Sequence, residues 1–435
     1  MAQQRPSARP GLRQALSALA YPDYRAFSIS FLLTSLGAQL VQVAVLWQVY
    51  LITGSALLIG LTGLARAVPH IALSLVGGVI ADRVNRVRLI QAGQLANGLL
   101  MLALAALTLL GRVEVWHLYL VTALNAAFTA LTQPARTALI PRLVPADRLL
   151  NAIGLNATIG QVAQIVGPAL GGIAIAAVDL GPVYVVNGLL YLASMMAILG
   201  VRTPSTPPAV AESPWRSFLD GLKFVRSRSV IVSLLALDVG ATALGSYRGL
   251  LPIFAATLGV GATGFGLLSA APGVGALAGA AFILSLGDFR YKGVYTLCGV
   301  LAYCGAAIML ALSPWFWLSL VAAALLGATN SIQMIPRNTV ILTISPDAMR
   351  GRVEAFRSML AGGAPPLGYT LAGALADVFG PAMALVSGSL ACVLFVGGIA
   401  AASRELRDPD LGAVPARESE TGDSAATAGA APGSR

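Results

Sequence analysis

The sequence has few charged side chains. Only 11% of its 435 residues are Asp, Glu, Lys or Arg, whereas 57% are hydrophobic, and the mean hydropathy is +0.79. A soluble domain with so little charge would not stay dispersed in water, so the composition excludes that class and predicts a helical protein with many membrane spans. In a soluble protein the net charge of +10 would suggest a nucleic-acid partner. Here the cations lie in short loops between apolar runs, so we expect no nucleic acid.

Residue types that hold metals or carry out catalysis are also scarce. The sequence has three cysteines, all within apolar runs, and two histidines. Their spacing suits neither a metal cluster nor a structural disulfide. The sequence also lacks a Ser/His/Asp grouping, a phosphate-cradling Gly-Lys-Ser motif and any stretch that resembles a nucleotide-binding domain. We therefore expect no metal, no cofactor, no ATP hydrolysis and no enzymatic activity.

Long apolar runs follow one another along the chain, each near the ~20 residues that a helix needs to cross a bilayer core. They predict an all-α membrane protein with twelve transmembrane helices, at residues 24–52, 56–80, 89–111, 115–140, 151–177, 182–202, 230–256, 263–286, 292–312, 314–342, 351–378 and 380–403. We expect residues 1–23 and 404–435 to be disordered cytoplasmic tails. Residues 203–229 are predicted to form a cytoplasmic linker with an amphipathic helix on the membrane surface.

Lysine and arginine residues are concentrated in alternate loops. Of the 28, 24 lie in the two tails and in the loops that the predicted topology places inside, and the outside turns hold only Arg112. The other three, Arg66, Arg248 and Arg357, lie within spans. Because cytoplasmic loops carry an excess of Lys and Arg, we expect both termini in the cytoplasm, on the inner face of the cell membrane. An even number of spans is then required.

An internal repeat indicates how the spans are arranged. The Arg and Pro at 136 and 145 recur at 337 and 346, and Gly167 shifted by the same 201 residues falls on Gly368. One half of the chain therefore repeats the other. This predicts two six-helix bundles, residues 24–202 and 230–403, joined by the linker at 203–229, with a substrate held between them near the bilayer midplane.

A short charged turn separates the second and third predicted spans. Its pattern Gly-x-x-x-Asp-Arg-x-x-Arg, with Asp82, Arg83 and Arg86 at the charged positions, resembles the signature loop of the major facilitator superfamily. The resemblance implies that these residues hold the cytoplasmic seam between the bundles shut. Asn85 stands where many members have Gly, and Asn tolerates a left-handed conformation. The alternative is a solvated turn that merely follows the charge rule.

Further charged residues near the cytoplasmic ends of the spans extend this predicted gate. Many drug/proton antiporters of the superfamily carry an arginine deep in the fourth span, but here the arginine of that span, Arg136, lies at its cytoplasmic end. We interpret Arg136 as a partner of Asp82. The gate of the second half is predicted to consist of Arg337, Arg350, Glu354 and Arg357.

Two further stretches narrow the resemblance. The loop at 133–145, Gln-Pro-Ala-Arg-Thr-Ala-Leu-Ile-Pro-Arg-Leu-Val-Pro, and the Thr-Gly-Ser-Ala turn at 53–56 resemble the branch that contains the enterobactin exporter and the macrolide efflux proteins, over roughly residues 20–403. The fifth span matches the antiporter motif, with Ala163 at its middle glycine, at Gly154, Gly167, Pro168, Gly171 and Gly172. The motif implies export driven by proton antiport. Ordinary close packing of small residues is the alternative.

Charges within the spans require a reason, because each costs at least ~2.5–3.5 kcal/mol on insertion scales. Asp238 is the only carboxylate deep in a predicted span, and Arg66 and Arg248 are the other deep charges. Asp238 is interpreted either as a protonation site or cation contact, or as a static ion pair with an arginine. Gly240 and Gly245 offer a bend in the seventh span.

In this fold the first, fourth, seventh and tenth spans line the cavity. The polar and aromatic side chains that these spans offer, besides Asp238, are Gln39, Gln42, Trp47, Asn125, Tyr247, Asn330 and Gln333. Each either touches substrate or bonds a neighbouring helix. The sequence thus predicts a monomeric secondary-active transporter that exports an amphipathic small molecule, a drug, macrolide or siderophore, by proton antiport with alternating access. The alternatives are a nutrient importer on the same fold and, more remotely, a non-transporting membrane sensor.

Overall fold

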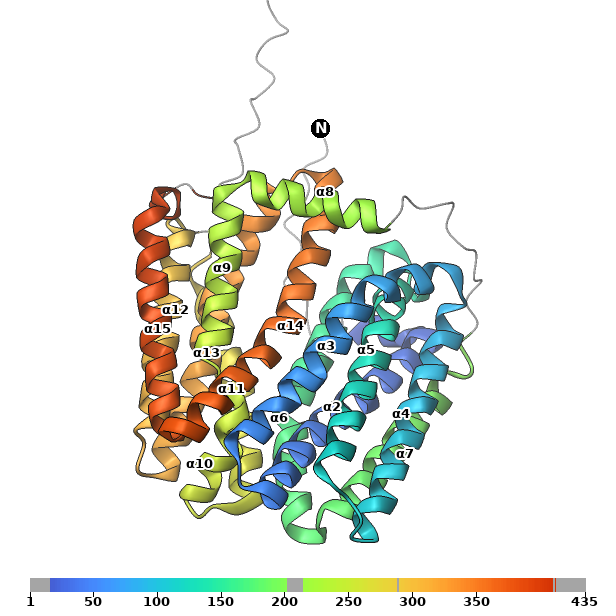
Figure 1. Ribbon diagram of the computed structural model, residues 1–435. Helices are drawn as coiled ribbons and strands as arrows, with labels where there is room; N and C mark the ends of the chain where they lie inside the picture. Colours follow the sequence, from blue (N-terminus) through green and yellow to red (C-terminus); the bar gives the residue numbers. More distant parts are fainter. Residues whose placement is uncertain (1–15, 202–213, 288, 410, 412–435) are drawn as a thin grey trace, which may run out of the picture.

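The computed structural model consists of helices and short connections (Figure 1). It describes residues 16–201, 214–287, 289–409 and 411, and no strand occurs among them. The first bundle consists of η1 (Leu16–Ala20), α2 (Pro22–Thr53), α3 (Ala56–Arg83), α4 (Arg86–Leu109), α5 (Val115–Leu143), η2 (Ala146–Arg148), α6 (Leu149–Val178) and α7 (Leu180–Ile198). The second consists of α9 (Ser229–Leu244), η3 (Arg248–Leu250), α10 (Leu251–Thr257), α11 (Gly261–Ser285), α12 (Lys292–Ala311), α13 (Phe316–Ile344), α14 (Asp347–Phe379), α15 (Pro381–Ala402) and η4 (Arg404–Arg407).

Within the described residues, eleven spans are long and apolar enough to cross a membrane, with α9 to α10 counted as one. α14 falls outside this set because its first turns carry charged residues and the uncharged stretch after them is only weakly hydrophobic, with several glycines and with Pro365 and Pro366. It is nevertheless 33 residues long and packs along α3 of the other bundle. α14 is therefore the twelfth long element, six in each bundle, as the repeat predicts.

The seventh span is broken, although the sequence predicts one helix over 230–256. α9 ends at Leu244, where Gly245 caps it, and the chain becomes helical again only at η3 and α10. Gly245 and Gly249 disfavour a continuous helix, and Pro252 is favoured in the first turn of α10 because it has no amide hydrogen to leave unpaired. The break places Tyr247 and Arg248 between the helices rather than along one face.

The charged turn between α3 and α4 is stabilised by a helix cap. The Asn85 side chain accepts hydrogen bonds from the backbone N–H groups of Val87 and Arg88, at 3.0 and 3.1 Å. Its backbone is extended, with φ −62° and ψ 115°. The expectation of a left-handed Asn85 is therefore wrong: the residue is suited to this turn as an N-cap, which satisfies two free amides of α4.

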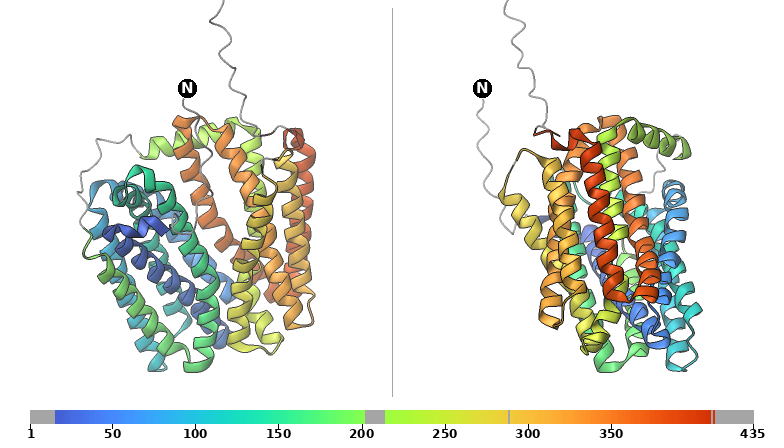
Figure 2. Two further views of the ribbon diagram at one scale, coloured as in Figure 1. Left: turned by 180° about the vertical axis from the view of Figure 1, so that it is seen from behind. Right: turned by 60° about the vertical axis from the view of Figure 1, so that its left-hand side comes forward.

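Among the described residues, the closest contacts between the two bundles run from one end to about the middle of the helices. We call the end where these contacts begin the closed end, which holds the turn at 53–55 and Gly380, and we call the opposite end, which holds α8 (Pro214–Ser227), the open end. α3 packs on α14, and α6 packs on α11. Both views in which the bundles lie side by side show α3 and α14 diverging towards the open end (Figures 1 and 2).

Hydrogen bonds and close backbone contacts hold the closed end. Thr370 donates to the carbonyl of Gly60 at 2.9 Å, and Ser55 donates to Asp377 at 3.0 Å. A side chain at Gly63 would collide with the carbonyl of Pro366, so only glycine allows α3 to approach α14 this closely.

The hydrophobic cores follow the same division. One buried cluster is shared by both bundles, and in it the ring of Trp47 stacks on Phe265 with centroids 5.6 Å apart. Towards the open end each bundle has a separate cluster, around Ile90 in the first and around Ile231 in the second. The predicted amphipathic helix is α8, which packs on α14 and α9 through buried Val225 and an ion pair of Asp220 with Arg352 at 3.2 Å.

Candidate transport cavity

One chamber at the contact between the bundles lies mainly in the second one. Its volume is about 330 Å³, at the lower end of the roughly 300–1,000 Å³ typical of small-molecule sites. The broken seventh span contributes Tyr247 and Arg248 to its wall. The other polar or aromatic lining residues are Gln164, Thr242, Ser246, Tyr303, Asn330 and Tyr369.

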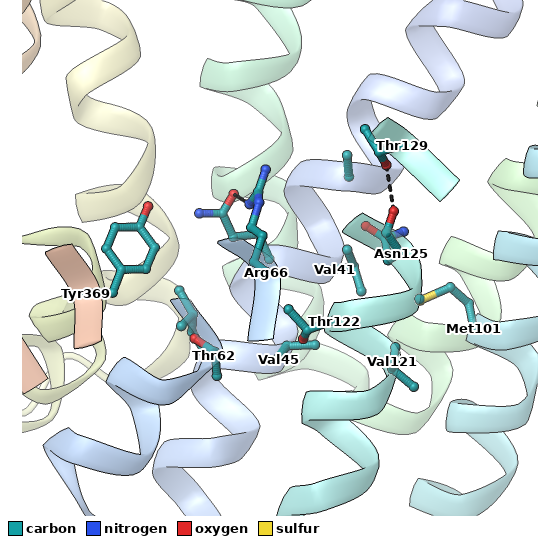
Figure 3. Close-up of a pocket in the computed structure, with 13 residues that line it drawn as sticks. Val41, Val45, Thr62, Arg66, Met101, Val121, Thr122, Asn125, Thr129 and Tyr369 are labelled. Atoms are coloured by element: carbon teal, nitrogen blue, oxygen red, sulfur yellow. Dashed lines mark hydrogen bonds between the residues drawn. The ribbon is translucent and has the colours of Figure 1, made fainter. Parts of the chain in front are cut away.

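A second pocket, of about 90 Å³, lies in the first bundle (Figure 3). Arg66 of α3 projects into it, and its Nη1 donates to Oε1 of Gln42 at 3.3 Å. The rest of the wall is largely apolar, with Thr122, Asn125 and Thr129 among the hydrocarbon side chains of Val41, Val45, Leu46, Met101 and Val121. The pocket therefore presents a charge beside hydrocarbon, which suits an amphipathic ligand.

The two pockets are neighbours. Tyr369 lines both, and a third pocket, of about 20 Å³, adjoins Gln42 of the first bundle and Arg248 of the second. Gln164 and Arg66 are exposed, which indicates that solvent reaches the walls. We call the three together the central cavity.

Five of the predicted cavity residues line the central cavity, and two do not. Gln39, Gln42, Asn125, Tyr247 and Asn330 are lining residues. Trp47 is instead buried against Phe265. Gln333 is fully buried and donates to Asn330 at 3.3 Å.

Asn125 fits both interpretations that the sequence left open. It lines the pocket of the first bundle, and its Nδ2 donates to Asn97 at 2.9 Å and to the Tyr191 hydroxyl at 3.2 Å. Its side chain is thereby fixed by two neighbouring helices, α4 and α7.

Sequence reasoning missed lining residues from other spans. Gln164 comes from α6, Tyr303 from α12 and Tyr369 from α14, whereas the expectation was limited to the first, fourth, seventh and tenth spans. A signal was present, because each is polar within an apolar span and Tyr369 follows Pro365 and Pro366.

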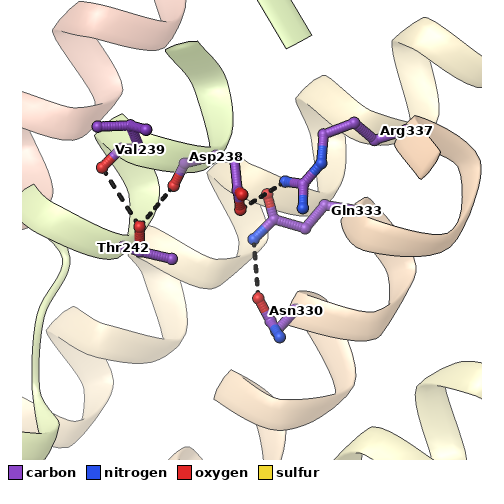
Figure 4. A network of polar contacts seen from close by, with 6 residues as sticks. All are labelled: Asp238, Val239, Thr242, Asn330, Gln333 and Arg337. Carbon is purple, nitrogen blue, oxygen red and sulfur yellow. Dashed lines mark hydrogen bonds and ion pairs between the residues drawn. The ribbon is translucent and has the colours of Figure 1, made fainter. Parts of the chain in front are cut away.

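Asp238 forms an ion pair in the interior of the second bundle (Figure 4). Its Oδ1 lies 2.7 Å from Nη1 of Arg337, and the two side chains are 12% and 3% exposed. Asp238 is not a lining residue of the central cavity, but Thr242, one turn further along α9, is. Arg337 thus contacts Asp238 inside the bundle, although it was predicted to belong to the gate. The pair corresponds to the ion-pair alternative, while a titrating Asp238 stays a prediction.

Arg136 is buried in the first bundle, at the position that the repeat relates to Arg337. Its Nη2 donates to the Thr34 hydroxyl at 3.2 Å, and Thr34 is also bonded to Gln94 and Ser194. Among the described side chains, no carboxylate pairs with Arg136. The Asp82 side chain lies outside the described residues, so the predicted pairing of these two residues is not observed.

The other predicted gate residues make contacts within their own bundles. Arg86 donates to the carbonyl of Ala138 at 3.3 Å, and Arg350 donates to that of Leu342 at 3.2 Å. Arg357 pairs with Glu354 one turn away, and Arg83 is exposed at the end of α3. A gate that joins the bundles through these residues stays a prediction.

Most of the antiporter motif lies in helix contacts at the closed end. Gly167 and Gly171 face Gln39, Leu40 and Val43 of α2, while Gly172 faces Gly266 of α11. Gly154, by contrast, has no atom of another element within 4 Å of the place where a side chain would begin. The motif therefore packs α6 between the two bundles, and Gly154 stands apart from that contact.

Known proteins resemble the chain over almost its whole length. Residues 13–423 match the model of the family described as transmembrane secretion effector. Among curated relatives, the enterobactin exporter EntS of Shigella boydii serotype 4 is 25% identical over 87% of this chain and 90% of its own. The EntS of Citrobacter koseri is 26% identical over 85% and 89%. Among solved structures, the nucleoside transporter NupG has a TM-score of 0.68 at 15% identity, over 87% of this chain and 98% of its own.

The fold and the relatives agree with each other. The predicted all-α architecture of two six-helix bundles is confirmed, and the chain is a multi-pass membrane protein. The family match covers far more than half of the sequence. The chain therefore belongs to the transmembrane secretion effector family and is a transporter of the major facilitator superfamily, in the branch of the enterobactin exporters.

Proposed function

We propose that this transporter exports an amphipathic small molecule from the cytoplasm by proton antiport with alternating access. The observation that carries the proposal is the central cavity between bundles that share a core at the closed end and have separate cores at the open end. In such an arrangement one rocking motion closes the open end and separates the closed end. The two curated relatives reported above are enterobactin exporters by name, which favours the outward direction.

The open end is proposed to face the cytoplasm, with both termini on that side of the cell membrane. The loops at this end contain the basic residues of 83–88 and 142–148, and α8 adds Lys223 and Arg226. The excess of cations supports this orientation. The central cavity is complete within one chain, so we further propose that the monomer is the working unit.

Asp238 is the proposed site of proton coupling. A proton on Asp238 would neutralise its carboxylate and weaken the attraction to Arg337, 2.7 Å away. Thr242 of the same helix lines the cavity, so a shift of α9 that follows the loss of this ion pair would change the shape of the substrate site. Deprotonation into the cytoplasm after substrate release would restore the pair.

Everted membrane vesicles test the proposal. Vesicles from cells that produce the chain are expected to accumulate siderophores or drugs from a panel when a proton gradient is applied, and a protonophore should abolish this accumulation. Vesicles without the chain serve as the control. Accumulation by right-side-out vesicles alone would instead establish a nutrient importer and reject the export proposal.

A further inference from the structure

The central cavity carries positive charge that no lining carboxylate balances. Arg66 and Arg248 both project into it, and no Asp or Glu is among the described residues that line its three pockets. We propose that its substrate is an organic anion with an apolar body. This inference rests on the proposed transport function, because it concerns the ligand of the same cavity.

Two carboxylates of the second bundle are paired with other arginines. Asp238 pairs with Arg337 at 2.7 Å, and Glu354 pairs with Arg357. Neither acid is left to balance Arg66 or Arg248. Among the described lining residues, the cavity wall therefore has two positive charges and no negative one.

Arg136 is a further buried arginine on α5, the helix that also contributes lining residues to the first-bundle pocket. It is 5% exposed, its Nη1 has no hydrogen-bond partner, and it lies on the same stripe of α5 as Asn125 and Thr129, which line the pocket. Residues 125, 129 and 136 share one helix face because four and eleven residues bring a helix back to nearly the same direction. A third positive charge thus lies near the cavity.

Solvent reaches Arg66, so water hydrates its charge until a ligand supplies a counter-charge. The two lining arginines have only neutral partners among the described residues. Arg66 donates to the side-chain oxygen Oε1 of Gln42 at a rather long 3.3 Å. The guanidinium carbon of Arg248 lies 5.7 Å from the centre of the Tyr247 ring. An arginine has five N–H donors in a planar fork that matches a carboxylate or sulfonate. Both guanidinium groups therefore keep donors for an acidic ligand.

The other lining side chains indicate what the uncharged part of this ligand is made of. Part of the pocket beside Arg66 is apolar, with Val41, Val45 and Met101, whereas Arg248 lies among Tyr247, Tyr303 and Tyr369. Aromatic rings offer flat surfaces on which another ring stacks. The structure therefore favours an aromatic acid over a small inorganic anion, and it disfavours a cationic drug, which two arginines would repel.

Three probes of one shape separate these classes. Naphthalenesulfonate is the anion, naphthalenesulfonamide is its neutral counterpart, and naphthyltrimethylammonium is the cation. The purified full chain in detergent micelles is titrated with each, and the rise of its thermal unfolding midpoint gives the affinity, because a ligand of the native state stabilises it. We expect a saturable rise with the sulfonate, and affinities roughly ten- to hundredfold weaker for the other two probes.

Substitutions identify the groups that recognise the charge. Arg66→Gln and Arg248→Gln should each weaken sulfonate binding by roughly tenfold or more and leave the weak sulfonamide affinity unchanged. Arg66→Lys and Arg248→Lys keep the charge and should retain most of the affinity, which excludes a loss caused by misfolding. Arg112→Gln, at an exposed arginine in the turn after α4, is the matched control and should bind like the unchanged chain.

The inference is overturned if the three probes bind equally, if the sulfonate gives no rise, or if both Arg→Gln variants bind it as the control does. None of these results affects the export proposal. That proposal is rejected separately, when everted vesicles accumulate no compound of any charge, even where the sulfonate binds to the purified chain.

Discussion

At the residue scale, the buried ion pair of Asp238 and Arg337 is the contact whose disruption should lower the free energy of unfolding most. Asp238→Asn leaves the Arg337 guanidinium buried without a counter-charge, which should lower the free energy of unfolding by roughly 3–5 kcal/mol. Chemical denaturation or thermal unfolding in detergent measures this loss. The double variant Asp238→Asn with Arg337→Gln removes both charges and is expected to recover much of the stability.

The same variants test proton coupling. In vesicles, the double variant should still bind substrate but should no longer couple its accumulation to the imposed proton gradient. Export with unchanged pH dependence would assign the pair a purely structural role and remove Asp238 from the coupling mechanism.

Variants of Asn125 test whether its hydrogen bonds to neighbouring helices stabilise the protein. Asn125→Ala leaves the buried Oδ1 of Asn97 without its donor, so we expect a loss of about 1–3 kcal/mol in the free energy of unfolding. Thr129→Ala is the control, because the Thr129 hydroxyl bonds only the backbone of its own helix and should cost less than about 0.5 kcal/mol. Equal losses in the two variants would show that the Asn125 bonds contribute little to stability.

Single residues were predictable from the sequence where chemistry alone selects them. Gln42 and Asn330 are polar groups in apolar spans, and each lines a pocket of the central cavity, while contact with substrate stays a prediction. The partner of Asp238 was not predictable, because three arginines lie within the spans and others lie at their ends. Which one comes within 2.7 Å depends on how α9 and α13 rotate against each other, and a single sequence does not give that rotation.

At the scale of helices, α6 is the element that contacts both bundles. A methyl group at Gly172 would lie 2.7 Å from Cα of Gly266. This is a backbone atom, so no side-chain rotation can relieve the clash. Gly172→Ala should therefore force α6 and α11 apart, at a cost of about 1–3 kcal/mol and with a loss of transport. Thermal unfolding and vesicle accumulation measure the two effects.

Gly160 provides the matched control on the same helix. It has no atom of another element within 4 Å of the added methyl, so Gly160→Ala should keep transport and change stability by no more than about 1 kcal/mol. If both variants transport normally, close approach of α6 to α11 is not needed for the transport cycle.

The number and order of the helices were predicted more reliably than the points where a span is interrupted. Twelve apolar runs gave the number and order of the long elements, because span length is set by the bilayer. The break after Leu244 was expected only as a bend at Gly240 or Gly245, since these glycines lie within a long apolar run whose only charged residues are Asp238 and Arg248. Arg248 is the residue that the break places in the cavity wall.

At the scale of the whole molecule, the internal repeat predicted two bundles but not their relative position. The repeat relates Arg136 to Arg337, and both are buried within their bundles. One of them has a carboxylate partner and the other has none among the described side chains. The halves therefore share a backbone plan while their charges differ, and the state of the cavity depends on contacts between halves that a repeat does not specify.

The orientation of the open end is the last testable feature of the whole molecule. Thr129 is exposed at the cavity wall of the first bundle, on the open side of the shared core. In a chain that also carries Cys298→Ser, because Cys298 is exposed, Thr129→Cys should react with a membrane-impermeant maleimide in everted vesicles and not in intact cells. Arg112→Cys, in the turn after α4 at the closed end, should show the opposite pattern. Labelling of Thr129→Cys in intact cells alone would place the open end outside, and the cavity would then load from the exterior, as an importer requires.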